Sequence, residues 1–83
     1  MDYKLSKHAL LRLKARNISK ENVFDVLHEP SSVIAQDESI TVYSKLVNEG
    51  SKVYLYRVFV NTTKNPYLVI TAYKTSKLEK YGN

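Results

Sequence analysis

Pro30 divides the sequence into two parts with different residue patterns. Before it, apolar residues recur at helical spacing in two short stretches, and after it β-branched and aromatic residues alternate with polar ones. A proline also pushes the residue before it out of the helical region, so a helix has to end there. The chain is therefore predicted to be an α+β protein whose helices come first and whose sheet follows.

Two serines mark the starts of the predicted helices. Ser6 can cap a helix over Lys7–Arg16, and Ser19 can cap a second helix over Lys20–His28. A serine hydroxyl in that position accepts a hydrogen bond from a backbone amide of the first turn, which has no partner within the helix. Because the two helices are separated by so few residues, the pattern predicts a helical hairpin.

Alternating runs after Pro30 predict about four strands joined by turns. The connecting segments are rich in Asp, Asn, Ser, Gly and Pro, the residues that tight turns favour. The predicted strands are Ser32–Gln36, Thr41–Val47, Val53–Asn61 and Tyr67–Thr75. Runs joined by such short turns pair with their neighbours, so we expect an antiparallel sheet.

The last predicted strand has the clearest alternation of side chains. The residues expected to face the helices are Leu68, Ile70 and Ala72. The residues expected on the opposite face are Val69, Thr71, Tyr73 and Thr75. If the register brings Arg57 of the preceding strand beside Thr71 and Tyr73, these three residues form a polar cluster in the middle of the sheet.

The length of the chain limits what it can contain. With 83 residues there is room for one compact core, so we expect a single domain over residues 1–83. The sequence has no cysteine, which excludes a disulfide framework and a thiolate zinc site. No apolar run approaches the roughly 20 residues that cross a bilayer. We therefore expect a cytoplasmic protein that does not span a membrane.

Basic residues outnumber acidic ones by 13 to 8, which gives a formal net charge of +5. Such an excess favours a polyanionic partner such as RNA, or an acidic protein. His8 and His28 make no recognisable metal-binding pattern, and two glycines cannot build a phosphate-binding loop. We therefore expect neither a metal ion nor another cofactor.

A cationic stripe runs along the first predicted helix, because His8, Arg12 and Arg16 follow one another at four-residue steps. Cleavage of RNA without a metal needs a base for the 2′-hydroxyl, an acid for the leaving oxygen and cations for the charged transition state. A neutral His8 could accept a proton while Arg12 holds a phosphate beside it. The same stripe is also typical of a solvated helix face whose long side chains cover the rim of the core, and both interpretations stay open.

The predicted sheet offers further candidates for the same chemistry. Arg57 could stabilise the charged transition state, Tyr73 could supply a hydroxyl donor, and the tyrosines could stack on bases. The alternative is structural, with Arg57 paired to a carboxylate or a carbonyl oxygen and with Thr71 and Tyr73 as ordinary residues of a half-exposed strand.

Two stretches together resemble a known family. They are His8-Ala9-x-x-Arg12-Leu13-x-x-Arg16-x-Ile18-Ser19 near the start and Val69-Ile70-Thr71-Ala72-Tyr73-Lys74-Thr75-Ser76-Lys77 near the end. They resemble an uncharacterised family of small bacterial and cyanobacterial proteins that is related to the RelE and ParE toxins. The fold of those toxins is the one found in the group of metal-independent ribonucleases that includes barnase, EndoU, colicin and RelE.

The resemblance implies a RelE-like fold, in which a helical hairpin packs on a curved antiparallel sheet. It also implies RNA cleavage and a small antitoxin partner. By position, His8 and Arg12 match the helix motif, Arg57 matches a basic position of the penultimate strand, and Thr71 and Tyr73 match the last strand. Because ParE-type relatives poison a topoisomerase without cutting RNA, the fold alone does not decide the activity.

The leading hypothesis is a metal-independent endoribonuclease toxin that cleaves RNA by 2′-OH transesterification. Its proposed catalytic residues are His8, Arg12, Arg57 and Tyr73. Its proposed RNA contacts are Lys7, Arg16, Thr71, Lys74 and Lys77. The alternative hypotheses are a ParE-like inhibitor or small RNA- or protein-binding module without catalysis, and a protein of unrelated role that keeps the fold. An exposed sheet edge could also support a homodimer.

Overall fold

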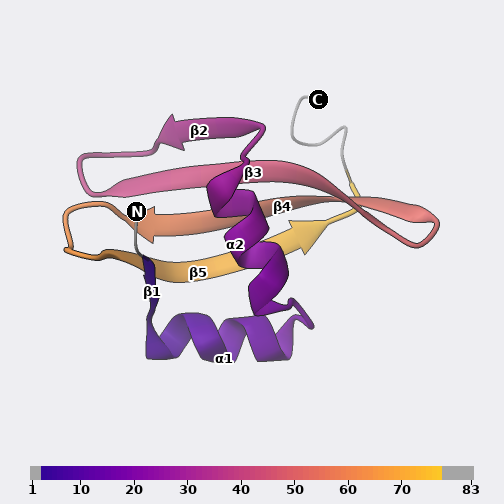
Figure 1. Cartoon of the computed structure of the whole chain (residues 1–83), viewed down its shortest axis with the longest axis horizontal. Helices are drawn as coiled ribbons and strands as arrows, with labels where there is room; N and C mark the ends of the chain where they lie inside the picture. Colours follow the sequence, from indigo (N-terminus) through magenta and orange to yellow (C-terminus); the bar gives the residue numbers. More distant parts are fainter. Residues whose placement is uncertain (1–2, 78–83) are drawn as a thin grey trace.

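The computed structural model describes residues 3–77 as two helices and a five-stranded sheet (Figure 1). The elements in chain order are β1 (Tyr3–Leu5), α1 (Lys7–Ala15), α2 (Lys20–His28), β2 (Ser32–Ala35), β3 (Ile40–Glu49), β4 (Lys52–Asn61) and β5 (Tyr67–Thr75). The prediction of an α+β protein with two N-terminal helices followed by a sheet is confirmed. The bounds of α2 and β5 are those predicted, and the other predicted elements differ at their ends by at most two residues.

Both helices begin where the serine caps predict. The Ser6 hydroxyl accepts a hydrogen bond from the Ala9 amide at 3.0 Å, and the Ser19 hydroxyl accepts one from the Asn22 amide at 3.1 Å. Between the helices, Asn17 adopts a left-handed backbone with φ of 55°, a conformation that asparagine tolerates better than most residues. The chain can therefore reverse between the two helices within a few residues.

Strand β1 is an element that the sequence did not predict. It lies at the edge of the sheet, whose order is β1-β5-β4-β3-β2, and it pairs with β5 in parallel, whereas all other neighbours are antiparallel. The Ser6 amide continues this pairing by donating to the Val69 carbonyl at 3.0 Å. Three residues are too few to show alternation. These residues form a strand because they pair with β5, and their own sequence does not indicate it.

A β-bulge in β5 corrects the predicted alternation of that strand. Val60 pairs with Val69 and Phe59 pairs with Thr71, so Ile70 is an extra residue between the two pairs. Val69 and Ala72 are consequently both fully buried in the core. The expectation that Leu68 and Ile70 face the helices together with Ala72 was wrong. Because of the bulge, Val69 is the residue that faces the helices together with Ala72.

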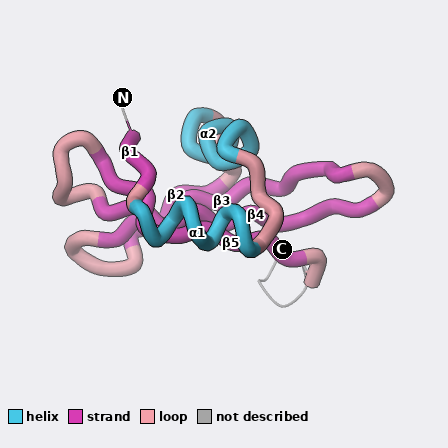
Figure 2. The backbone as a smooth tube through the Cα atoms, turned by 90° about the horizontal axis from the view of Figure 1, so that it is seen from below, coloured by secondary structure: helices cyan, strands magenta, loops and turns pink. Residues whose placement is uncertain are grey.

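The two helices cover only one face of the sheet. α2 crosses in front of the strands (Figure 1), and the second view shows α2 standing on one side of the sheet with α1 beside β5 (Figure 2). The core between them is built from Ala9, Leu13, Ile18, Val23, Val26, Leu27, Tyr56, Val58, Val60, Val69 and Ala72. Each of the valine, leucine and isoleucine side chains contributes about 1.5–3 kcal/mol by leaving water. Neither helix lies on the opposite side of the sheet, which we call the far face.

Neither helix of residues 3–77 is long and apolar enough to cross a membrane. The cytoplasmic location expected from the sequence stays a prediction.

The turn between β2 and β3 is organised by one carboxylate. Oδ1 of Asp37 accepts hydrogen bonds from the Ser39 and Ile40 amides, both at 2.8 Å, and from the Ser39 hydroxyl at 3.2 Å. These backbone donors favour the ionised form and lower the pKa of Asp37 below its usual value of 3.8. The folded state therefore gains stability from Asp37 only while this carboxyl is ionised.

We expect the substitution Asp37→Asn to remove part of the pH dependence of folding. A lowered folded-state pKa contributes stability above the unfolded value and loses it as the pH falls, so the wild type should weaken relative to Asp37→Asn between about pH 5 and pH 2. Urea unfolding followed by circular dichroism across this range measures the difference. Glu38→Gln makes the same charge change at the neighbouring exposed position and is the control. Parallel pH profiles for wild type and Asp37→Asn would contradict the assignment.

Candidate functional site

The centre of the far face holds a hydrogen-bonded pair of residues from two strands. Arg57 of β4 lies directly opposite Tyr73 of β5, and its Nη1 donates to the Tyr73 hydroxyl at 2.9 Å. Thr71 lies two residues before Tyr73 and faces Phe59 of β4. The register on which the predicted polar cluster depended is confirmed, because Arg57 does lie beside Thr71 and Tyr73.

Two aromatic rings lie close to the guanidinium of Arg57. Its Cζ lies 5.7 Å from the centre of the Phe59 ring and 5.9 Å from that of Tyr73. The two ring centres are 5.9 Å apart and the planes are tilted by 37°. These cation–π contacts place the planar guanidinium beside both rings, on the same side of the sheet. We call Arg57, Phe59, Thr71 and Tyr73 the Arg57 cluster.

The Arg57 cluster combines the groups that an exposed nucleotide needs. All four side chains are partly exposed, so the surface holds a fixed cation next to two aromatic rings and two hydroxyls. A guanidinium can bind a phosphate through paired N–H donors, and aromatic rings can stack on unpaired bases. Phe59 was not among the predicted site residues. Its position two residues from Arg57 on the same predicted strand could have indicated it, because such residues share one face of a sheet.

A second pair lies on α1. Nε of Arg12 donates to Nε2 of His8 at 3.2 Å, and both side chains are exposed. The acceptor in this bond is the lone pair of Nε2, so a substrate that gives its proton to this nitrogen has to displace Arg12 from it. The predicted neighbourhood of His8 and Arg12 is therefore present.

Arg16 extends the stripe but performs a structural task. Its Nη1 donates to the Ala72 carbonyl of β5 at 2.8 Å, which fixes the end of α1 against that strand. Because His8 and Arg12 precede Arg16 at four-residue steps, the stripe lies along the side of α1 that reaches β5 at this point. The hydrogen bond between His8 and Arg12 lies within α1, and that between Arg57 and Tyr73 joins β4 to β5, so we describe the two as separate groups.

Lys74 lies on the side of the sheet that the helices cover. Its ammonium group donates to Oε1 of Glu49 at 2.9 Å and to the Asn17 carbonyl at 3.4 Å, and its side chain is only 16% exposed. It also lies 4.9 Å from the centre of the Tyr54 ring. A lysine held by a carboxylate in this way is poorly placed to contact RNA.

The remaining predicted RNA contacts lie at several places. Lys7 is exposed at the first residue of α1, and Thr71 belongs to the Arg57 cluster. Lys77 is exposed just after β5, where its backbone amide donates to the Thr75 hydroxyl at 3.1 Å. Within residues 3–77, no group of three or more His, Asp or Glu side chains could hold a metal ion, and metal independence stays a prediction.

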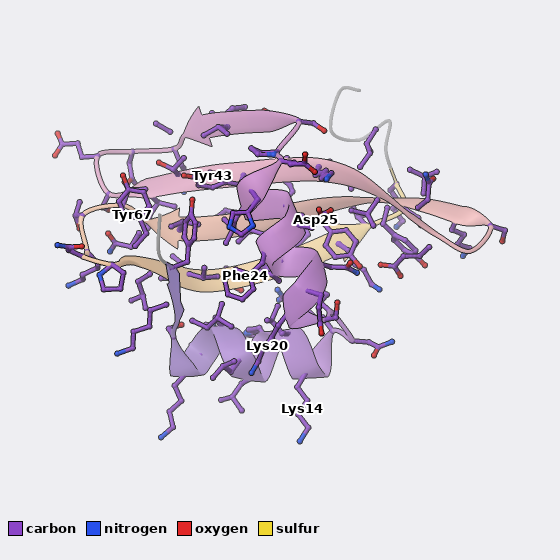
Figure 3. The ribbon with its side chains drawn as sticks, in the orientation of Figure 1. Lys14, Lys20, Phe24, Asp25, Tyr43 and Tyr67 are labelled. Atoms are coloured by element: carbon purple, nitrogen blue, oxygen red, sulfur yellow. The ribbon has the colours of Figure 1, made fainter. Side chains whose placement is uncertain are left out.

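A tyrosine cluster that the sequence did not predict lies on the helix-covered side. The Tyr3 ring contacts those of Tyr43 and Tyr67 edge to face, with centres 6.3 Å and 5.9 Å apart. Figure 3 shows Tyr43 and Tyr67 on the same side of the sheet as Phe24 of α2. Burial and a hydrogen bond with Tyr3 raise the pKa of Tyr43 to about 12. These ring contacts hold β1 onto the sheet, so we assign the three tyrosines a role in the stability of the fold.

The chain belongs to a family described as a domain of unknown function (DUF4258), whose sequence profile matches residues 5–74. This range contains both the α1 pair and the Arg57 cluster. No curated protein and no solved structure matches the chain significantly. The family is therefore established, and the activity has to be argued from the site.

We expect Lys74→Ala to destabilise the fold by about 1 kcal/mol, because it removes a half-buried ion pair and a cation–π contact. Lys77→Ala, the same change at an exposed residue three positions later, is the matched control and should have little effect. Urea denaturation of the three proteins measures the difference. Equal stability of Lys74→Ala and Lys77→Ala would contradict the structural role of Lys74.

Proposed function

We propose that this protein is a metal-independent endoribonuclease of the RelE-like toxin class, and that single-stranded RNA binds across the far face. The observation that carries the proposal is the Arg57 cluster, which offers a guanidinium next to two aromatic rings. Double-stranded RNA hides its base edges, whereas an unpaired strand can stack its bases on such rings. The substrate class is therefore RNA with unpaired nucleotides.

The proposed reaction is transesterification within the RNA. The 2′-oxygen attacks the adjacent phosphorus, the bond from phosphorus to the 5′-oxygen breaks, and the products are a 2′,3′-cyclic phosphate and a 5′-hydroxyl. His8 takes the proton of the 2′-hydroxyl, and Tyr73 donates a proton to the leaving oxygen. Arg12 and Arg57 stabilise the negative charge on the phosphate oxygens in the transition state.

Two parts of the structure have to act on one phosphate for this reaction. The anchor of Arg16 on Ala72 supports the proposal, because it fixes α1 against β5, the strand that also carries Tyr73. To contact both groups, the RNA strand has to cross the Arg57 cluster and then pass the edge of β5 to reach the α1 pair. The relation to RelE and ParE toxins and a small antitoxin partner form part of the same proposal.

One observation favours the second candidate, a module that binds RNA or a protein without cleaving anything. His8 is exposed and its hydrogen bond goes to Arg12 on the same helix. General-base catalysis needs His8 within hydrogen-bond reach of a 2′-hydroxyl that is bound at the Arg57 cluster. A binding module needs the cations and the rings but no such alignment.

We expect purified protein to cleave total cellular RNA in EDTA and to leave 2′,3′-cyclic phosphate ends. His8→Ala should lower the rate by about 100-fold or more, the usual contribution of a general base, and Arg57→Ala should lower it by a similar factor. His28→Ala removes the other histidine, which is exposed at the end of α2, and should leave the rate unchanged. Gel analysis and end-group mapping measure these effects.

The controls separate the two candidate functions. If folded wild type cuts no RNA, with or without ribosomes, catalysis is contradicted. If that protein still binds single-stranded RNA and loses affinity with Arg57→Ala, the binding module is correct. If His28→Ala reduces cleavage as much as His8→Ala does, the assignment of the base is wrong.

A further inference from the structure

The outer side of α1 carries a patch that neither the core nor the proposed reaction uses. Lys7, Leu10, Leu11 and Lys14 are all exposed, with 39% of Leu10 and 65% of Leu11 accessible to solvent. We call these four residues the leucine–lysine patch. Figure 3 shows Lys14 pointing away from the sheet, so the patch faces outward.

The four residues of the patch are neighbours on the helix surface. Each leucine lies three or four residues from each lysine, and these are the spacings at which side chains of a helix meet. Ala9 and Leu13 point into the core, and Leu11 lies between them in sequence on the opposite side of the helix. The patch is thus two adjacent apolar side chains with a cation at either end.

Among residues 3–77, neither lysine of the patch forms an ion pair. No acidic residue occurs between Tyr3 and Lys20 of the sequence. The three ion pairs of residues 3–77 all use Lys45 or Lys74, which lie on β3 and β5. The lysines of the patch therefore present positive charge to whatever approaches α1.

We propose that the leucine–lysine patch binds an acidic amphipathic helix of a partner protein. Side chains at three- and four-residue spacing on such a helix form holes that accept a leucine from the facing helix. Glutamates beside those holes would meet Lys7 and Lys14. The proposal does not depend on RNA cleavage, because it uses none of the four proposed catalytic residues and shares only Lys7 with the proposed RNA contacts.

The chemistry of the patch favours a protein over the other anionic partners. A phosphate backbone would pair with the lysines but leave the two exposed leucines in water, whereas a protein buries both. An anionic membrane requires a broad apolar helix face, and the apolar face of α1 is already committed to the core through Ala9 and Leu13. A helix with an apolar centre and an acidic rim matches all four side chains.

The test is a titration of the whole protein with a fluorescently labelled synthetic helical peptide. Its leucines recur at three- and four-residue spacing and are flanked by glutamates, and a scrambled peptide of identical composition is the control. Wild type should bind the patterned peptide at least about tenfold more tightly than the scrambled one, a factor that corresponds to about 1.4 kcal/mol. Leu11→Ser should remove most of this preference.

Matched variants distinguish binding at the patch from the effect of removing any exposed leucine or reversing the charge of any exposed lysine. Leu46→Ser changes another exposed leucine, which lies on β3, and should bind as wild type does. The double variant Lys7→Glu with Lys14→Glu should lose binding, whereas Lys52→Glu with Lys64→Glu makes the same charge change at exposed sites on and beyond β4 and should keep it.

Three results would overturn the proposal. The first is equal affinity for the patterned and scrambled peptides, or no binding of either. The second is an equal loss of affinity with Leu11→Ser and Leu46→Ser. The third is Leu11-dependent binding to phosphatidylglycerol vesicles without binding of the peptide, which would assign the patch to a lipid surface. Circular dichroism of each variant confirms that a loss of binding is not a loss of folding.

Discussion

The burial of one side of β4 against the two helices is the interaction on which the rest of the structure depends. Tyr56, Val58 and Val60 are fully buried in the core at alternate positions of this strand. Because side chains alternate across a strand, this burial forces Arg57 and Phe59 onto the far face. Two helices of nine residues each cover one face of the sheet, and neither helix lies over Arg57 on the other face.

The bulge at Ile70 completes the candidate site from the neighbouring strand. Val69 and Ala72 are both buried although they are three residues apart, which a regular strand does not allow. The extra residue resets the alternation, so Thr71 and Tyr73 lie on the far face. The Tyr73 hydroxyl can then accept a hydrogen bond from Arg57. Packing in the core and the geometry of the site thus have a common cause.

Local signals in the sequence were sufficient for the elements that depend on short-range chemistry. The serine caps located both helices, because a cap is a contact within a few residues. The bounds of β5 and the pairing of His8 with Arg12 were also predictable from spacing. Arg57 could be placed on the same face as Phe59 by alternation alone, and its position beside Tyr73 followed once the register was known.

Features that depend on distant parts of the chain could not be predicted. Strand β1 forms because its three residues pair with the edge of β5, and these residues show no alternation that would predict a strand. The bulge has no glycine to mark it, since the extra residue is an isoleucine. Lys74 was predicted to contact RNA, but an ion pair with Glu49 from another strand holds it on the helix-covered side. In each case tertiary packing decided between conformations that the local sequence allowed equally.

The most direct test of the central claim is a nuclear magnetic resonance titration of the labelled protein with a single-stranded oligonucleotide whose 2′-hydroxyls are methylated. The methyl groups prevent cleavage, so the bound state is stable during the measurement. The account predicts that the largest shifts occur at Arg57, Phe59, Thr71 and Tyr73 and that α2 is unaffected. Shifts confined to α2 and the helix-covered side, or no shifts at all, would contradict it.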